Sequence, residues 1–170
     1  MPFLWSVRPQ GRTSSGRRGL NKLTALLDEL GVQVDAQLFE LAFTHRSFAF
    51  EHGRIPSNER LEFLGDAVLQ IVVTEHIFTS FPNLAEGQLA KLRASVVSSH
   101  ALAEVARELH LGELIRLGQG EINTAGADKT SILADTMEAV IGAIHISCGA
   151  VASSRFVHAL LDERIASSEL

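Results

Sequence analysis

The chain has 170 residues, 46% hydrophobic and 21% charged, a composition that indicates one folded domain and excludes a disordered or collagen-like chain. Its single cysteine excludes an internal disulfide and a cysteine-rich zinc site, and no apolar run reaches the ~18 residues of a membrane span, so we expect a cytoplasmic protein with no membrane partner. The net charge is −5, and bulk charge alone argues against binding to nucleic acid.

The first segment, residues 1–19, differs from the rest of the chain. It holds four arginines, no acidic residue and several Ser, Gly and Pro residues, without an apolar period. This composition is typical of a disordered segment; a basic arm that touches RNA and a transit-type peptide are the alternatives. Residues 20–170 carry the remaining net charge of −9, so binding to phosphate there requires local basic patches or bound cations.

Apolar residues spaced three and four apart predict helices over most of the remaining chain. Leucines from Leu20 to Leu30 form the first such pattern, which Gly31 ends. No alternating run is long enough for a sheet, so the predicted fold class is all-α. The predicted helices cover about residues 20–30, 36–42, 59–78, 84–97, 99–110, 130–147 and 151–165.

Capping residues and loops separate these helices. Residues 51–58 are rich in turn formers. The Gly-rich residues 118–127 are interpreted as a loop rather than a phosphate cradle, because no GxxxxGK[ST] pattern is present and no strand precedes them. The predicted helix N-caps are Asp35, either Ser57 or Asn58, and Asn83 in a capping box with Glu86. Either Thr130 or Ser131 starts the helix that follows the Gly-rich loop.

Residues 59–73 form the most informative segment. On a helix, Glu59, Glu62 and Asp66 fall within about 60° of one another. The rest of the segment is almost entirely apolar, so this helix should be largely buried. Burying three carboxylates is costly unless something positive neutralises them, and Arg60 is the only basic residue of the segment.

A second apolar helix, predicted from residue 130 onward, repeats this pattern. Asp135 and Glu138 share one helix face, and no basic residue lies between Lys129 and His145. We expect the two carboxylate pairs to face each other across hard divalent cations, Mg²⁺ or in its place Mn²⁺. The alternatives are ion pairs with distant arginines, a solvated rim, or a carboxylate di-iron site. The last is disfavoured because no Glu is followed by His three residues later.

The segment Glu59–Leu69 (ERLEFLGDAVL) resembles the signature of ribonuclease III, a family of double-stranded-RNA endonucleases. Four further segments resemble the family in the same order and spacing, so that the resemblance covers nearly the whole folded region and is particularly close to actinobacterial members. These segments are Leu41–Ser47 (LAFTHRS), Glu86–Val97 (EGQLAKLRASVV), Leu117–Glu121 (LGQGE) and Ser131–Gly142 (SILADTMEAVIG).

The resemblance implies the ribonuclease III endonuclease-domain fold over residues 20–168, as a homodimer with one site per subunit. We expect no double-stranded-RNA-binding domain in this chain and no organic cofactor. Carried over by position, it implies that the catalytic residues and metal ligands are Glu62, Asp66, Asp135 and Glu138, and that Glu59 and Glu86 are auxiliary acids. Candidate contacts to RNA phosphates are Arg46, Lys91, Arg93 and Lys129.

The implied reaction is Mg²⁺-dependent hydrolysis of double-stranded RNA, with ribosomal RNA precursors and messengers as substrates. One ion activates a water and a second stabilises the leaving oxygen, giving 5′-phosphate and 3′-hydroxyl ends with short 3′ overhangs. The alternative is a non-catalytic RNA-binding or assembly module on the same fold. Relatives of that kind normally lose a metal carboxylate, whereas all four are present here.

Three further residues, Gly65, His145 and His45, stand in or near the matched segments. Gly65 allows close approach of another backbone, which we interpret as a dimer contact, with packing inside one subunit as the alternative. His145 continues the stripe of Asp135 and Glu138 and is interpreted as a hydrogen-bonded core histidine rather than a metal ligand. His45 is interpreted as a structural residue that orients a loop.

Overall fold

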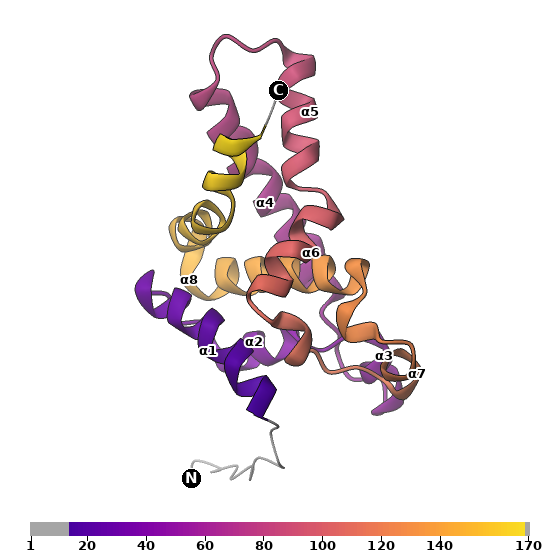
Figure 1. The fold of residues 1–170 in the computed structure, drawn as a ribbon. Coiled ribbons are helices and arrows are strands. Elements are labelled where there is room, and N and C mark those ends of the chain that lie inside the picture. The colour runs from indigo at the N-terminus through magenta and orange to yellow at the C-terminus, as the bar shows by residue number, and fades with distance from the viewer. Residues whose placement is uncertain (1–13, 169–170) are drawn as a thin grey trace.

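The computed structural model describes residues 14–168 of the chain, coloured in Figure 1. Within that range the fold is all-α, as predicted, and extended pairing is limited to an isolated bridge between Thr44 and Arg116. The helices in chain order are α1 (Ser14–Glu29), α2 (Ala36–Ala42), α3 (Arg46–Glu51), α4 (Glu59–Ser80), α5 (Glu86–Val96), α6 (Ser99–Glu108), α7 (Gln119–Asn123) and α8 (Thr130–Ser167), with short 3₁₀ turns η1 (Leu111–Glu113) and η2 (Gly126–Asp128).

Helix α8 consists of two helices joined at a kink. Gly149 has φ 85° and ψ 178°, a conformation that glycine adopts readily and other residues do not. The kink lies between the predicted helices 130–147 and 151–165 and confirms that division. Helix α8 is long and apolar enough to cross a membrane. Its first half, however, lies in the protein core, and packing there accounts for its apolar residues.

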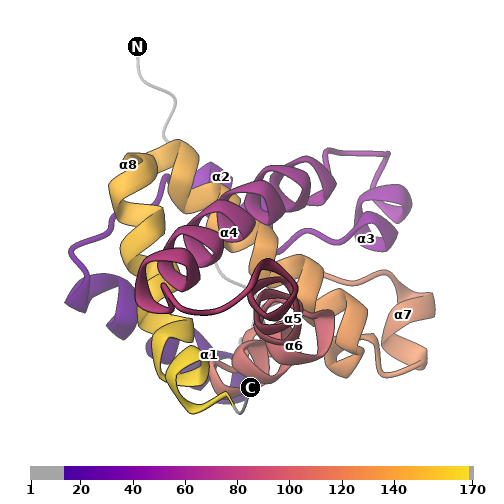
Figure 2. The same ribbon diagram turned by 90° about the horizontal axis from the view of Figure 1, so that it is seen from above.

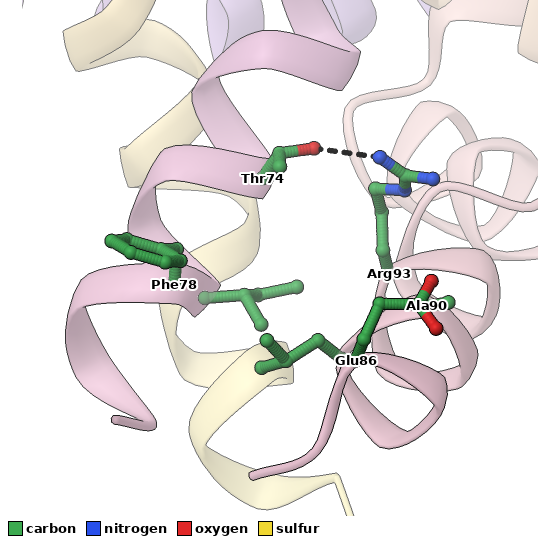
Figure 3. A pocket seen from close by; sticks show the side chains of 7 residues that line it. Thr74, Phe78, Glu86, Ala90 and Arg93 are labelled. Atoms are coloured by element: carbon green, nitrogen blue, oxygen red, sulfur yellow. Dashed lines mark hydrogen bonds between the residues drawn. The ribbon is translucent and has the colours of Figure 1, made fainter. Parts of the chain in front are cut away.

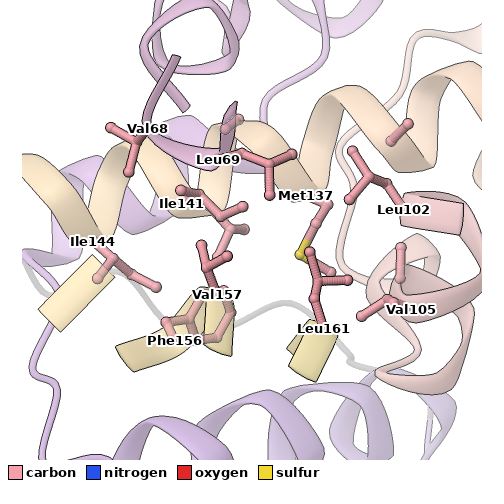
Figure 4. Close-up of a cluster of buried hydrophobic side chains, with 14 of the residues drawn as sticks. Val68, Leu69, Leu102, Val105, Met137, Ile141, Ile144, Phe156, Val157 and Leu161 are labelled. Atoms are coloured by element: carbon pink, nitrogen blue, oxygen red, sulfur yellow. The ribbon is translucent and has the colours of Figure 1, made fainter. Parts of the chain in front are cut away.

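The first half of α8 forms the centre of the core. Helix α4 crosses it on one side, α6 packs along it, and the second half of α8 folds back beside α4 (Figure 1 and Figure 2). Each buried Leu, Ile or Phe side chain stabilises such a core by about 1.5–3 kcal/mol. Figure 4 shows this cluster, with Val68, Leu69, Leu102, Val105, Met137, Ile141, Ile144, Phe156, Val157 and Leu161 labelled.

Two glycines determine how closely α4 and α8 cross. A Cβ added to Gly65 would overlap the carbonyl oxygen of Glu138, and one added to Gly142 would overlap the carbonyl oxygen of Leu61. The two backbones therefore touch at this crossing. The close approach predicted at Gly65 is made within one chain, so its interpretation as a dimer contact was wrong.

The N-terminal boundary differs from the prediction. Helix α1 begins at Ser14, earlier than the predicted start at Leu20. The end of the segment 1–19 that was expected to be disordered is thus helical, while its residues 1–13 lie outside the described range.

The N-terminus of α4 lacks the side-chain cap that the sequence predicts. Neither Ser57 nor Asn58 caps the helix through its side chain. Asn58 is 2% exposed and turns inward, where its Nδ2 donates to the carbonyl oxygen of Ala42 at 3.2 Å. The hydroxyl of Ser57 donates to Glu59 at 2.6 Å. The predicted cap of α2 is confirmed, because Asp35 accepts from two backbone N–H groups of that helix.

The predicted capping box of α5 was also wrong. The side chain of Gln88 accepts from the backbone N–H of Ala85 at 3.1 Å, so the helix starts at Glu86 and not directly after Asn83. Helix α8 begins at Thr130, as predicted, and the residue before it, Lys129, makes no side-chain cap.

The short helices α3 and α7 were not predicted, because five or six residues are too few to display a helical period. Helix α7 lies inside the predicted loop 118–127. Helix α3 starts after His45, which is 9% exposed and whose Nδ1 accepts from the backbone N–H of Ser47 at 3.2 Å. The structural interpretation of His45 is confirmed.

Candidate active site

The crossing of α4 and α8 brings carboxylates from both helices together. Glu62 lies one turn before Gly65 on α4, while Asp135 and Glu138 lie one turn apart on α8. One carboxylate oxygen from each of the three lies within 4.8 Å of the other two. Oxygens that share one Mg²⁺ at 2.0–2.1 Å stand about 3–4 Å apart, so small side-chain adjustments would bring these oxygens onto a single ion.

Asp66, the fourth predicted ligand, lies beside this group rather than in it. Its side chain is exposed, and Oδ1 accepts a hydrogen bond from Nε2 of Gln70 at 3.3 Å. Its charge is nevertheless close enough to raise the pKa of both Glu62 and Glu138. The structure therefore brings three of the four predicted ligands together and places the fourth at their border.

Burial and mutual repulsion disfavour the ionised carboxylates. Burial raises the pKa of Glu138 to about 8, and the charges of Asp66, Asp135 and Glu62 add to the shift. Burial also raises the pKa of Glu62 and of Asp135, although the charge of Arg46 opposes both shifts. None of the three clustered carboxylates forms an ion pair within the described residues. The cluster therefore keeps a proton at neutral pH or takes up a cation.

A cavity opens in front of Glu62 and Asp135. Two basic residues line it, Arg46 with an exposed side chain and Lys129, whose Nζ donates to Oε2 of Glu121 at 2.6 Å. The bond from Lys129 lowers the pKa of Glu121. The lining residues are His45, Arg46, Asn58, Glu59, Glu62, Glu121, Lys129, Ser131, Ile132 and Asp135.

The remaining predicted site residues divide between two places. Glu59 is exposed and lines the carboxylate cavity. Glu86 and Arg93 lie on α5 and line a different, mainly apolar pocket between α4 and α5, where Arg93 Nη1 donates to Oγ1 of Thr74 at 3.0 Å (Figure 3). Lys91 is exposed on the same helix. Within one chain, α5 therefore contributes no residue to the carboxylate cavity.

Sequence reasoning gave no site role to two titratable residues of this cavity, His45 and Glu121. Burial lowers the pKa of His45, so its imidazole stays neutral at physiological pH. Glu121 reaches the cavity because α7 turns it inward toward Lys129. Both residues stand in the segments LAFTHRS and LGQGE that carry the resemblance, which is the one signal that could have found them.

His145 lies away from this cavity. Its Nδ1 is 3.0 Å from the hydroxyl oxygen of Ser153, and this hydrogen bond spans the kink at Gly149. The predicted hydrogen bond is confirmed, although His145 is only partly buried and lies outside the hydrophobic core.

Known proteins similar to this chain carry both the sequence pattern and the fold. A family model described as Ribonuclease-III-like matches residues 35–164. Ribonuclease 3 of Streptomyces coelicolor is 57% identical over 145 residues, which cover 85% of this chain and 52% of that protein. Ribonuclease 3 of Thermobifida fusca is 54% identical over 139 residues, covering 82% of this chain and 58% of that protein. The chain thus spans about half the length of the curated relatives it matches.

A solved structure agrees with these relatives. The nuclease domain of ribonuclease III from Campylobacter jejuni superposes with a TM-score of 0.76 at 39% identity, covering 86% of this chain and 98% of that one. The clustered carboxylates Glu62, Asp135 and Glu138 all lie within the matched family region. The chain therefore belongs to the ribonuclease-III-like family and has the fold of its nuclease domain.

Proposed function

We propose that this chain is an endoribonuclease that hydrolyses double-stranded RNA with Mg²⁺, for which Mn²⁺ can substitute. The observation that carries the proposal is the convergence of Glu62, Asp135 and Glu138, with Asp66 at their border, beside an open cavity. The relatives named ribonuclease 3 support this activity. We further propose that its substrates are ribosomal RNA precursors and messengers in the cytoplasm, and that the products have 5′-phosphate and 3′-hydroxyl ends with short 3′ overhangs.

The clustered residues fit a hard divalent cation. All three converging ligands are carboxylates, the donors that Mg²⁺ and Mn²⁺ prefer, and they project from two helices fixed in the core. Burial and the neighbouring carboxylates raise the pKa of Glu138, and a bound cation would stabilise its ionised form. A bound Mg²⁺ would lower the pKa of a water molecule and neutralise charge that develops on the phosphate.

The chain itself supplies orientation and charge for the reaction. Asp135 and Glu138 extend from the buried half of α8, so their positions are fixed by core packing. Arg46 and Lys129 face the same cavity and provide positive charge for the RNA backbone. The ion pair with Glu121 holds the ammonium group of Lys129 in place. Phosphate contacts of this kind suit an A-form duplex, which proteins recognise mainly by shape and backbone.

We also propose that the chain forms a homodimer through α4. Phe63 is 82% exposed, Ile71 63% and Phe78 69%, and their spacing puts them within about 80° of one another on the helix. Phe78 also borders the apolar pocket between α4 and α5 (Figure 3). Large exposed apolar side chains aligned along one helix face favour an interface, and a two-fold axis allows the same face to pair with itself. A solved structure of the Campylobacter jejuni nuclease domain describes a flexible region involved in dimer formation of that protein.

The experiment that tests the proposed function is cleavage of an end-labelled RNA duplex in low-salt buffer. We expect Mg²⁺-dependent cuts on both strands with staggered ends. No cuts are expected with Ca²⁺, or from the variant Glu138→Gln. Binding of the duplex without cleavage by the unmodified chain would contradict the proposal and favour the non-catalytic RNA-binding module.

A further inference from the structure

Helices α4 and α8 meet a second time, near their C-terminal ends, around three side chains of different chemistry. His76 lies on α4, and His158 and Asp162 lie one turn apart on the second half of α8. One potential ligand atom from each lies within 4.8 Å of the other two. Nδ1 of His158 is 2.8 Å from Oδ1 of Asp162, and Nε2 of His76 is 3.8 Å from the same oxygen.

We propose that His76, His158 and Asp162 bind a Zn²⁺ ion that cross-links α4 to the second half of α8. Two imidazole nitrogens and one carboxylate oxygen form a ligand set that zinc accepts at about 2.0–2.1 Å, with a fourth position left for water. Tetrahedral geometry at that bond length separates ligand atoms by about 3.3 Å. The two separations of 2.8 and 3.8 Å lie on either side of this value, so small side-chain rotations complete the site.

The fold presents these ligands from fixed positions. Ile77, the neighbour of His76, is 1% exposed, and so are Val157 and Leu161, the neighbours of the two ligands on α8. Each ligand therefore stands on a backbone that core packing holds in place. The ligand side chains themselves are 25%, 36% and 44% exposed, which leaves an ion free to enter from solvent.

The charges around Asp162 favour a cation at this position. Among the described residues its ionic partners are His76 and His158, and no Lys or Arg pairs with it. A divalent cation bound between the three side chains would compensate the carboxylate charge. Mg²⁺ avoids imidazole and prefers oxygen, so the carboxylate cluster and this histidine site select different ions.

The experiment is a titration of the metal-free full chain with Zn²⁺, in buffer that contains saturating Mg²⁺. At a Zn²⁺ concentration about 100 times Kd, we expect Tm to rise by roughly 5–10 °C. Titration with Co²⁺ should produce the visible absorption of a nitrogen-ligated, four-coordinate ion. Both signals should disappear in His76→Gln and in Asp162→Asn. RNA cleavage in Mg²⁺ by these variants should be unchanged.

The matched control is His100→Gln on α6. His100 pairs with Glu104 at 3.2 Å through the same i, i+4 spacing, and this pair belongs to no group of three potential ligands among the described residues. This variant should keep the full response to Zn²⁺, and so should Glu138→Gln. The proposal is overturned if Zn²⁺ leaves Tm unchanged, or if His76→Gln and His100→Gln respond alike. Loss of the response in Glu138→Gln alone would assign the ion to the carboxylate cluster and would equally overturn the proposal.

Discussion

Helices α4 and α8 meet at two places that differ in chemistry. At the first, Gly65 and Gly142 allow the backbones to touch, and Glu62 and Glu138 are brought together with Asp135. At the second, two histidines and one aspartate meet half-exposed near the helix ends. One pair of helices thus presents a cluster made only of carboxylates at one end and a mixed nitrogen and oxygen cluster at the other.

The two clusters differ in how a bound cation would affect their charges. In the first cluster like charges repel one another, and the pKa of Glu138 rises to about 8 as a result of burial and of these neighbours. In the second cluster the aspartate already accepts a hydrogen bond from His158 when that nitrogen is protonated. A cation would therefore relieve repulsion among several carboxylates in the first cluster, whereas in the second it would compensate a single carboxylate and cross-link the two helices.

The largest expected effect comes from Glu138→Gln. The amide keeps the shape of the side chain but removes a ligand charge, so we expect cleavage to fall by roughly 10³-fold or more. Duplex binding in Ca²⁺ should change little. Single-turnover cleavage together with filter binding measures both quantities. A folded variant that cleaves at the rate of the unmodified chain would remove Glu138 from the site.

The glycine contact at the first crossing is tested by Gly65→Ala. The added methyl group would overlap the carbonyl oxygen of Glu138, and overpacking of this kind costs about 1–3 kcal/mol of the free energy of unfolding, or more. The control is Gly87→Ala on α5, where a Cβ meets nothing within 4 Å, so this variant should be as stable or slightly more stable. Thermal unfolding compares the two. Equal Tm values would show that the helices do not touch at Gly65.

The repulsion within the carboxylate cluster predicts a pH dependence of stability. In the folded chain Glu138 keeps its proton up to pH about 8, whereas the unfolded chain releases it near 4.5. The folded state therefore binds more protons than the unfolded state between these pH values. The stability that the protonated Glu138 contributes is lost as pH rises through that window. Burial lowers the pKa of His45 below 6.5, which destabilises the fold as pH falls and so acts in the opposite sense.

Comparison of the unmodified chain with Glu138→Gln separates the effect of the Glu138 carboxyl group on stability from that of His45. In EDTA, the Tm of the variant relative to the unmodified chain should increase from pH 5 to pH 8. Mg²⁺ should reduce this difference, because a bound cation removes the repulsion. Parallel Tm curves in EDTA would contradict the raised pKa of Glu138.

Binding of RNA at the first cluster is tested by Arg46→Gln. Loss of one phosphate contact should weaken duplex binding several-fold and reduce the slope of log K against log salt by about 1. The control is Arg155→Gln, since Arg155 is exposed on the second half of α8 and outside the carboxylate cavity. Fluorescence anisotropy at three salt concentrations measures both the affinity for the duplex and its salt dependence. Identical salt slopes for the two variants would exclude a phosphate contact at Arg46.

The smallest effect is expected from His158→Gln in metal-free buffer. The half-exposed pair of His158 and Asp162 resembles a surface ion pair, which contributes about 0–1 kcal/mol. We therefore expect a Tm change of at most a few degrees without metal. A large loss of stability in EDTA would mean that the second meeting point is held by the histidine itself and needs no ion.

The sequence predicted the long helices and the grouping of Glu62, Asp135 and Glu138, because both depend on local pattern. The two apolar helices display enough turns for their period to be read, and their unpaired carboxylates are visible in the same stretch. The caps failed where tertiary contacts decided the outcome. Asn58 turns inward to bond Ala42 instead of capping its own helix, a choice that depends on residues far away in the sequence.

Contacts between distant segments set the limit on predicting the sites. The spacing of His158 and Asp162 can be read from the sequence, but nothing local places His76 beside them. Similarly, Gly65 predicts a close backbone approach, but the sequence does not identify Gly142 and Glu138 as the partners. Asp66 shares a helix face with Glu62 in the sequence pattern, yet its side chain turns to Gln70 at the border of the cluster.

The most direct test of the carboxylate cluster as a metal site is calorimetric titration of the chain with Mn²⁺ at pH 7, in two buffers of different ionisation enthalpy. Because Glu138 holds a proton at this pH, binding of the ion should release about one proton, and the heat should depend on the buffer. Glu138→Gln should bind Mn²⁺ at least about tenfold more weakly, with no proton release. Equal Mn²⁺ affinity and equal heats for the two proteins would contradict a metal site that includes Glu138.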